Sequence, residues 1–325
     1  MAKSSGPAAA PKKVEPHLYF GGAWQKYPAH RWYTGTVWHY TSVAGFYGIV
    51  SNHELWASSA TMLNDASEMS FGVARVREAY VRWRPAETAH AAANRVIHDA
   101  IDSLETMMST TPPFVLSAST SPELLNQWAN YGESSGCAVG LASMTLLIAE
   151  GKAGKLRPTN ALPLWHKVIY KSAAQETHIR RILDQMVDPE GMIARATAEE
   201  AYVGAGVLAM QNLAMLAATL KHPGFQAERE VRFLAFREEE TRVHFRPTPR
   251  GIVPYVKLFG TEMDETEGVQ YSTSLDDKIR LPIVGARVGP PQGESEQRRA
   301  AAMHEFLHAH DYDVEVQGAG IPYLP

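Results

Sequence analysis

Short apolar segments separated by turn residues indicate that strands lie near both ends of this chain, with helices between them. Four segments in the first half have the β-branched and aromatic residues typical of strands, at residues 36–41, 55–58, 114–118 and 137–141. Ser42 follows the first of them directly and is placed to cap a helix over residues 43–50. The first predicted strand therefore brings its polar residues to the start of a helix.

Apolar residues at three- and four-residue spacing predict two long helical stretches, at about 67–109 and 173–221. The remainder of the chain is again strand-rich, at residues 230–237, 242–246, 254–259 and 281–288. After the N-terminal tail the sequence shows no long linker rich in Pro, Gly and Ser. This order predicts one α+β domain over residues 17–325, with a mixed or antiparallel sheet core and the two helical stretches as insertions.

Composition narrows the class of protein. Residues 1–16 are rich in Ser, Gly, Pro, Ala and Lys and lack the apolar core of a secretory signal, so we expect a disordered tail. The most apolar helix candidate, residues 195–220, is interrupted by Gln211 and Asn212, which favours a core helix over a membrane span. The single cysteine, Cys137, cannot form an internal disulfide, and a reducing, cytoplasmic location is expected.

The balance of charges limits the expected partners. Lys and Arg number 31 against 35 Asp and Glu, which leaves a formal charge of −4. This total argues against a broad basic groove for nucleic acid and leaves only a local patch open. The His and Cys spacings typical of zinc sites do not occur in the sequence, so no metal is expected.

The first candidate site is the predicted strand that contains His39. Alternation along a strand puts His39 and Thr41 on one face and Tyr40 on the other, and Ser42 begins the helix. These side chains could hydrogen-bond a ribose or a phosphate, because the unpaired N–H groups at a helix N-terminus attract anions. The alternative is a buried His and Thr whose polar atoms bond the neighbouring backbone.

Two further segments could form walls of a ligand site. Asn64 and Asp65, with Glu68 close behind, lie in a predicted loop, although Asp65 could simply cap the next helix. Trp128 and Tyr131 lie three residues apart on a predicted helix and could offer an aromatic surface. The alternative for this aromatic pair is core packing.

A third candidate lies on a late strand, where alternation aims Glu228, Glu230 and Arg232 at one face. If this face is exposed to solvent, the three residues form an ion-pair ladder without a function. If it faces His39, its carboxylates are placed to stabilise a developing cation. Only the tertiary structure can distinguish the two.

Several of these segments together resemble the bacterial family catalogued as domain of unknown function 2971. The resemblance runs from Thr36 to Tyr323 and rests on His39-Tyr-Thr-Ser42, Leu55-Trp56, Leu63-Asn-Asp65 with Glu68, Ser117-Ala-Ser119, Gln127-Trp128, Tyr131-Gly132, Gly136-Cys-Ala-Val-Gly140, Lys221 with Phe225, Glu228-Arg-Glu-Val-Arg232 and Ile321-Pro-Tyr323. The activity of that family is unassigned. The resemblance therefore implies a shared fold more than a reaction.

The segment His39-Tyr-Thr-Ser42, followed by a helix and a new strand, is also distantly similar to the opening of ADP-ribosyltransferases. Those enzymes carry their catalytic Glu on a late strand, and the pair Glu228-x-Glu230 falls where that Glu is expected. The similarity implies an ADP-ribosyltransferase-like fold with NAD as the substrate. The central aromatic motif of those enzymes has its nearest counterpart at residues 55–59, and residues 67–108 have none.

The same similarity implies a role for each residue. His39 would bond the adenosine ribose of NAD, and Thr41 and Ser42 would line the nicotinamide pocket. Glu230 would hold the nicotinamide ribose and stabilise the cation that forms when the glycosidic bond breaks. The side chains that could stack on the nicotinamide are Tyr40, Trp128 and Tyr131.

Three functions remain open from the sequence. The first is an NAD-dependent ADP-ribosyltransferase or NAD glycohydrolase, with a role in bacterial stress or phage defence. The second is a metal-dependent phosphodiesterase or nuclease, with His39 as base and Asp65, Glu68, Glu228 and Glu230 as metal ligands. The third is a non-catalytic nucleotide-sensing module. The expected partner is a nucleotide, no membrane is expected, and the acceptor of a transfer could be a protein, a nucleic acid, a small molecule or water.

Overall fold

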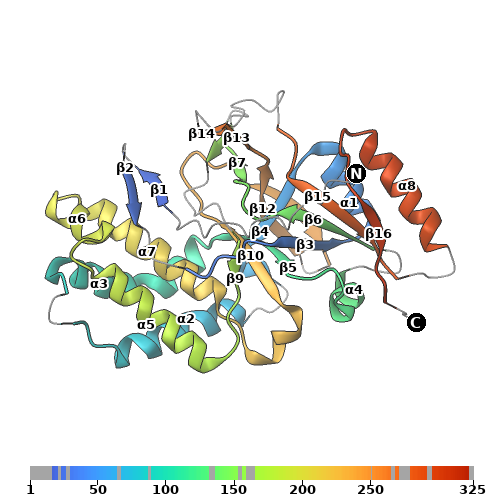
Figure 1. Cartoon of the computed structure of the whole chain (residues 1–325). Helices are drawn as coiled ribbons and strands as arrows, with labels where there is room; N and C mark the ends of the chain where they lie inside the picture. The colour runs from blue at the N-terminus through green and yellow to red at the C-terminus, as the bar shows by residue number, and fades with distance from the viewer. Residues whose placement is uncertain are drawn as a thin grey trace, which may run out of the picture.

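A computed structural model of the chain describes residues 17–20, 23–26, 30–63, 67–86, 89–131, 136–152, 156–158, 165–249, 251–264, 268–270, 279–290 and 295–321. The predicted tail at residues 1–16 and the predicted site residues Asn64 and Asp65 lie outside these ranges. Within the described ranges a helical half and a β-rich half lie side by side (Figure 1).

Most of the strands join one mixed sheet. The strands are β1 His17–Phe20, β2 Ala23–Lys26, β3 Thr36–Thr41, β4 Leu55–Ser59, β5 Phe114–Ser119, β6 Cys137–Ala142, β7 Ile148–Glu150, β8 Leu156–Pro158, β9 His166–Lys167, β10 Glu230–Ala235, β11 His244–Thr248, β12 Gly251–Phe259, β13 Glu262–Asp264, β14 Gly268–Gln270, β15 Ile283–Val288 and β16 Val316–Gly318. The sheet order is β16-β15-β6-β3-β5-β4-β12-β7-β8, with β10 between β5 and β9 and with β11 beside β12. β15 and β16 pair in parallel, whereas β3, β4 and β10 pair with β5 in antiparallel fashion. The predicted α+β fold with a mixed sheet is confirmed.

The helices occupy two parts of the molecule. They are α1 Val43–Asn52, α2 Glu68–Arg82, α3 Ala91–Thr110, α4 Leu125–Tyr131, α5 Ser172–Met186, α6 Met192–Ala198, α7 Tyr202–Thr219 and α8 Glu296–His308, with short 3₁₀ turns η1 Ala60–Met62 and η3 Pro223–Glu228. α2, α3, α5, α6 and α7 pack together as the helical half, while α1 and α8 lie beside the sheet (Figure 1). The helical half is thus built from two segments, one between β4 and β5 and one between β9 and β10.

The prediction of one long helix at residues 195–220 is wrong. The structure divides this stretch into α6 and α7, and Glu200 adopts a left-handed conformation with φ 59° in the break. α7 is long and apolar enough to cross a membrane by composition alone, but it packs against α2, α3 and α6. The approach to α2 is close, because a Cβ on Gly72 would lie 2.0 Å from the carbonyl oxygen of Ala217.

β5 is the strand at which the sheet divides. β10 pairs with β5 along its whole length on one edge, from Glu230 opposite Ser119 to Ala235 opposite Phe114. The other edge is shared, since β3 pairs only at Ser119 and β4 pairs only at Val115 and Phe114. The sheet therefore forks into a β3 branch and a β4 branch, and no strand among the described residues pairs with the middle of β5 on this edge.

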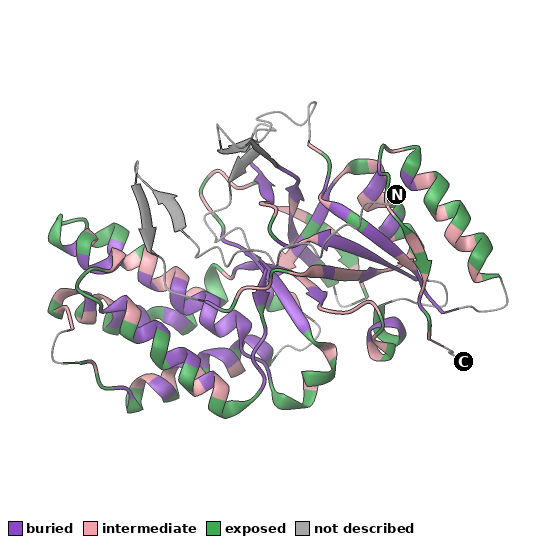
Figure 2. Cartoon of the chain, in the orientation of Figure 1, coloured by how far each residue is buried: buried purple, intermediate pink, exposed green. Residues whose placement is uncertain are grey.

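The two faces of β5 belong to different cores. Leu116 and Ala118 pack into a core formed by the strands with α1 and α8, whereas Val115 packs into the core of the helical half. Buried residues accordingly gather both in the helical half and along the sheet (Figure 2). Ser117 and Ser119 share the face of Val115, because side chains alternate along a strand.

Candidate functional site

Five charged residues from two distant parts of the chain, Glu68 and the segment 221–232, meet on the helix-facing side of β10. Glu68 begins α2, Lys221 follows α7, Glu228 ends η3, and Glu230 and Arg232 lie on β10. We refer to these five residues as the charged cluster. All of them belong to the sequence motifs that the family resemblance rests on.

Arg232 is the centre of the charged cluster. Its guanidinium holds Glu230 with two hydrogen bonds, Nε to Oε1 at 2.8 Å and Nη2 to Oε2 at 2.9 Å. Nη1 donates to the carbonyl oxygen of Ala218 at 2.6 Å, and Nη2 also donates to the carboxylate of Glu68. Each nitrogen of this guanidinium therefore has an acceptor.

Lys221 is the second cation of the charged cluster. Its Nζ lies 2.9 Å from Oε2 of Glu230, 2.7 Å from Oε2 of Glu228 and 3.3 Å from Oε1 of Glu68. The ammonium also lies 4.9 Å from the ring centroid of Phe225. Two cations thus serve three carboxylates, which leaves the charged cluster with a formal charge of −1.

Burial and pairing set the ionisation of Glu230. Burial raises the pKa of its carboxyl, but the neighbouring charges of Arg232 and Lys221 outweigh burial and lower the pKa to about 2. Burial lowers the pKa of Lys221, and the carboxylate of Glu230 reverses this effect and raises it. Both groups are therefore charged at neutral pH.

The charged cluster is closed on one side and open at its rim. The side chain of Arg232 is 1% exposed, whereas that of Glu228 is 15% exposed. Removing a partner from a buried charge is strongly destabilising, because the remaining charge has neither water nor a counter-ion. Glu228 is consequently the carboxylate of the charged cluster best placed to meet a ligand.

The predicted alternation of Glu228, Glu230 and Arg232 along one strand is wrong for Glu228. β10 begins at Glu230, and Glu228 ends the 3₁₀ turn η3. Arg229, between them, adopts a left-handed conformation with φ 46°. Glu228 reaches the charged cluster through its bond to Lys221 and not through the pleat of a strand.

His39 is connected to Glu230 through one residue, Ser117. The Nδ1 of His39 lies 2.9 Å from the carbonyl oxygen of Ser117, and the Ser117 side chain hydrogen-bonds the carboxyl of Glu230. A carbonyl oxygen only accepts, so Nδ1 carries the proton. The imidazole thereby satisfies a β5 carbonyl at the fork of the sheet.

The strand register gives His39 and Glu230 opposite directions. Glu230 pairs with Ser119, and Ser119 pairs with Trp38, so these three side chains share a face. His39 follows Trp38 and points to the other face of the β3 branch. Burial lowers the pKa of His39, with a further contribution from the charge of Arg246, so the ring is neutral at neutral pH.

Tyr40 and Trp128 hold the loop after β5. The hydroxyl of Tyr40 donates to the carbonyl oxygen of Ser121 at 2.9 Å and accepts from the backbone N–H of Leu124 at 3.1 Å. Its ring meets Trp128 edge to face at 4.8 Å, and burial raises its pKa to about 12. Trp128 is itself buried and bonds the carbonyl oxygen of Pro122, so the pair packs as part of the core.

The other predicted site residues have different surroundings. The Ser42 hydroxyl accepts from the N–H of Gly45 at 3.1 Å and caps α1. Thr41 is half-buried and lies close to Gly45. A Cβ added to Gly45 would lie 2.1 Å from Oγ1 of Thr41. Tyr131 ends α4 and is 37% exposed, and α4 contacts η3, the turn that ends with Glu228.

Three residues outside the predicted site take part in it. Lys221 and Ser117 bond Glu230 directly, and the hydroxyl of Tyr170 accepts the backbone N–H of Glu230 at 2.8 Å. Lys221 could have been noticed from sequence, because a lysine directly after an apolar core helix needs buried counter-ions. Ser117 and Tyr170 carry no such signal, since nothing in their local pattern indicates which strand they meet.

Three buried histidines lie beside the charged cluster. His166 pairs with Arg232 in the strand register, and His30 lies 5.8 Å from His166 and 6.0 Å from His178 between ring centroids. Burial lowers the pKa of His30 to about 4 and that of His178 to about 3. Among the residues that the structure describes, no group of His, Cys, Asp and Glu is arranged to hold a metal ion.

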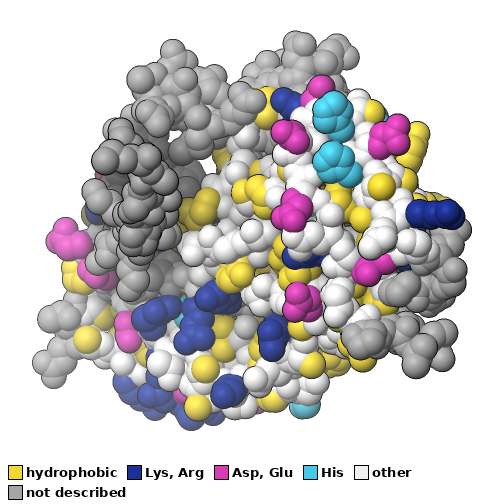
Figure 3. Space-filling model, turned by 45° about the vertical axis from the view of Figure 1, so that its right-hand side comes forward, with side chains coloured by type: hydrophobic (Ala, Val, Ile, Leu, Met, Phe, Trp, Pro, Cys, Tyr) yellow, Lys and Arg dark blue, Asp and Glu magenta, His cyan; other side chains and the backbone are white. Residues whose placement is uncertain are grey.

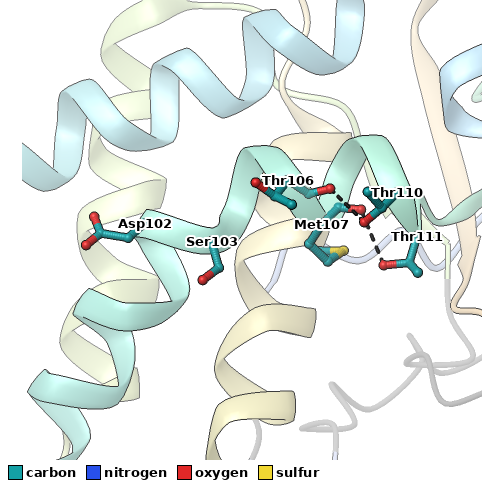
Figure 4. Close-up of a pocket in the computed structure, with 6 residues that line it drawn as sticks. All are labelled: Asp102, Ser103, Thr106, Met107, Thr110 and Thr111. Carbon is teal, nitrogen blue, oxygen red and sulfur yellow. Dashed lines mark hydrogen bonds between the residues drawn. The ribbon is translucent and has the colours of Figure 1, made fainter.

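A surface hollow on α3 is separate from these residues. Thr110 and Thr111 hydrogen-bond backbone carbonyls one turn earlier in the hollow (Figure 4). The residues that line it are Asp102, Ser103, Thr106, Met107, Thr110 and Thr111. All come from the end of one helix and the residue after it, and none belongs to the charged cluster.

Comparison with known proteins identifies one family. The family model described as "Protein of unknown function (DUF2971)" matches residues 127–233, a stretch that contains Lys221, Glu228, Glu230 and Arg232. No curated protein and no solved structure matches the chain. The resemblance stated from the sequence is therefore confirmed over residues 127–233, which match the DUF2971 family model.

Proposed function

We propose that this protein binds NAD and cleaves its nicotinamide glycosidic bond, as an ADP-ribosyltransferase or an NAD glycohydrolase with an ADP-ribosyltransferase-like fold. The observation that carries the proposal is the connection from His39 through Ser117 to Glu230 at the fork of the sheet. Two segments almost 200 residues apart in the sequence are joined there by a single residue.

The charge of the cluster suits this reaction. When the bond between the ribose and nicotinamide breaks, the bonding electrons leave with neutral nicotinamide and the ribosyl group becomes an oxocarbenium-like cation. A nearby carboxylate stabilises such a cation. The charged cluster has a formal charge of −1, and the low pKa of Glu230 keeps that carboxylate ionised at neutral pH. The acceptor, water or another nucleophile, then bonds the ribosyl carbon and releases a proton.

The residues take different parts in this proposal. Neutral His39 donates through Nδ1 to the carbonyl oxygen of Ser117, so it acts from the other face of the sheet as a positioning residue for the strand whose Ser117 side chain bonds Glu230. Glu230 supplies fixed negative charge from within the charged cluster. Glu228, at the rim, is the carboxylate that approaches the nicotinamide ribose, which is a change from the role first expected of Glu230.

A non-catalytic nucleotide sensor is the second candidate. Arg232 and Lys221 both form ion pairs with Glu230. Because these cations neutralise its carboxylate, the arrangement also suits a site that binds a nucleotide without turnover. A metal-dependent phosphodiesterase is less well supported, because Lys221 and Arg232 already occupy the positions between the carboxylates where a cation would lie.

Nicotinamide release from NAD by the purified full-length protein tests the proposal. We expect turnover that persists with a chelator and that falls at least ten-fold in Glu228→Gln and His39→Ala. The matched control is Glu78→Gln, which removes an exposed carboxylate paired with Arg75 on α2. Thermal melts of each variant separate loss of activity from loss of fold.

The outcomes of this experiment distinguish the three candidate functions. NAD binding without nicotinamide release, abolished by the same two variants, would establish the sensor. Hydrolysis of a phosphodiester that disappears with chelator would favour the metal-dependent enzyme. If the protein neither binds NAD nor releases nicotinamide from it, the proposal is refuted.

A further inference from the structure

Three rings form a continuous stack on the sheet beyond the fork. Trp56 on β4 stacks on Tyr255 of β12 with ring centroids 4.5 Å apart and planes at 30°. Tyr255 stacks in turn on His244 of β11, at 5.4 Å and 30°. We refer to Trp56, Tyr255 and His244 as the aromatic ladder. Its rings come from three neighbouring strands: His244 lies directly opposite Tyr255, whereas Trp56 lies diagonally across from Tyr255, two residues from Ser58, which is the partner of Tyr255.

Two buried glutamates hold the ends of the aromatic ladder. The indole N–H of Trp56 donates to Oε1 of Glu54 at 2.8 Å, and Lys257 donates to Oε2 at 3.0 Å. At the other end, Nε2 of His244 lies 2.7 Å from Oε2 of Glu150. Glu54 is 6% exposed and Glu150 is 2% exposed. The rings are thereby fixed before any ligand arrives, which lowers the entropy lost on binding.

Arg246 lies over the aromatic ladder with a hydrogen-bond donor unused. Its guanidinium carbon is 5.6 Å from the ring centroid of Trp56 and 6.0 Å from that of Tyr255, and Nη2 donates to Ser58 Oγ at 2.9 Å. Its Nε is buried and has no hydrogen-bond partner among the described residues. The guanidinium as a whole is a cation placed to attract the phosphate of a ligand on Trp56.

The aromatic ladder meets solvent at Trp56, whereas Tyr255 is 7% exposed, and its surroundings are cationic. Trp56 is 40% exposed, which is unusual for so large an apolar side chain held so rigidly. The surrounding cations are Arg242, Arg246 and Lys257, against the carboxylates of Glu54 and Glu150. The local charge is therefore +1, whereas the chain as a whole is −4.

Charge elsewhere is also arranged in small groups. On the face shown in Figure 3, a group of lysines and arginines gathers at the lower left, and acidic side chains are scattered over the rest of the described surface. No broad basic groove crosses the described atoms of this view. A nucleic acid would therefore be bound by local stacking more than by a long-range field.

We propose that the aromatic ladder binds single-stranded nucleic acid, with one base stacked on Trp56 and the adjacent phosphate on Arg246. Aromatic stacking with a nearby guanidinium is the general mode of single-strand binding and tolerates any base, because every base has a flat π-face. A duplex keeps its bases stacked inside and has no free face for Trp56.

The aromatic ladder borders the charged cluster. Ser58, which bonds Arg246, pairs with Val115 on β5, two residues from Ser117. The same register puts Ser58 and Ser117 on one face of the sheet. A strand bound on the aromatic ladder would be a nearby acceptor for a transferred ribosyl group. That role as acceptor rests on the proposed function, whereas binding of the strand does not.

Fluorescence anisotropy with a short labelled single-stranded oligonucleotide tests the proposal on the full-length protein. Trp56→Ala should weaken binding about ten-fold or more, since it removes the stacking surface. Arg246→Gln should weaken binding and reduce its dependence on salt, because one phosphate contact is lost. Trp56→Phe keeps a ring and should retain most of the affinity.

The matched control is Phe245→Ala. Phe245 is an adjacent aromatic on β11 that is 65% exposed and points to the opposite face, so its removal should not change binding. No binding by the wild type, equal binding of a duplex, or equal loss in Phe245→Ala would overturn the proposal. Because anisotropy is measured without NAD, its outcome is independent of nicotinamide release.

Discussion

The charged cluster and the aromatic ladder combine the same charged residue types in opposite surroundings. Both contain glutamates paired with a lysine and an arginine, Lys221 and Arg232 in the charged cluster and Lys257 and Arg242 at the aromatic ladder. In the charged cluster every nitrogen of Arg232 has an acceptor, whereas Arg246 over the aromatic ladder has an unused Nε–H. A fully bonded, buried guanidinium holds the fold together, and a stacked one with a donor to spare is available to a ligand.

The largest expected difference between the two regions is in stability. Arg232→Met leaves Glu230 and Glu68 buried without their main counter-ion and should lower the free energy of unfolding by about 3–5 kcal/mol. Arg246→Met breaks a half-exposed contact and should cost less than about 1 kcal/mol. Urea unfolding of both variants measures the contrast, and equal losses would show that the two arginines do not differ in this way.

A graded effect on stability is expected from acid, small just below pH 6.5 and growing as the pH falls. His30 and His178 have pKa values of about 4 and about 3 in the fold, well below the value of about 6.5 in an unfolded chain. Between these values the unfolded chain binds protons that the folded protein does not. Stability should therefore fall as pH decreases from about 6.5, by up to about 1.4 kcal/mol per pH unit for each histidine.

Unfolding followed at a series of pH values measures this slope. His30→Asn keeps a partner for Asn212 and removes one titrating ring, so the slope should become shallower. Below about pH 4.5, protonation of the unfolded Glu230 adds a second loss, since its pKa in the fold is about 2. An unchanged slope in the variant would mean that His30 is not buried in its neutral form.

The smallest expected effect concerns the support of the aromatic ladder. Glu54→Gln keeps an acceptor for the indole N–H of Trp56 but removes the ion pair with Lys257. Stability should change by less than about 1 kcal/mol, nicotinamide release should be unchanged, and oligonucleotide affinity should fall by a few-fold. A loss of NAD turnover in this variant would show that the two regions are coupled.

Part of this structure could be predicted from short-range pattern alone. The strands at 36–41, 114–118 and 137–141 and the cap at Ser42 follow from local residue preferences, and all appear in the structure within a residue or so. The break between α6 and α7 was missed, because no Pro interrupts residues 195–220 and Glu200 carries no signal for a left-handed conformation. The ADP-ribosyltransferase-like similarity and the residue roles that it implies remain proposals.

The site was harder to predict than the strands. The alternation of side chains along a strand correctly predicted that Glu230 and Arg232 share a face. It did not predict that Glu228 lies on η3 or that His39 points away from Glu230. The face on which a side chain lies depends on which strands pair and in which register. Register depends in turn on contacts between residues far apart in the sequence.

The sequence by itself determined the elements and the α+β class of this protein, because backbone propensities and the period of apolar residues act over a few neighbouring residues. Only the tertiary structure decided that Glu68, Lys221 and Arg232 share one charged cluster and that Trp56, Tyr255 and His244 stack across three strands. Those contacts depend on how the sheet forks at β5 and on how closely α2 packs against α7. The fork of the sheet and the packing of α2 against α7 both depend on packing between segments far apart in the sequence, so no local segment encodes them.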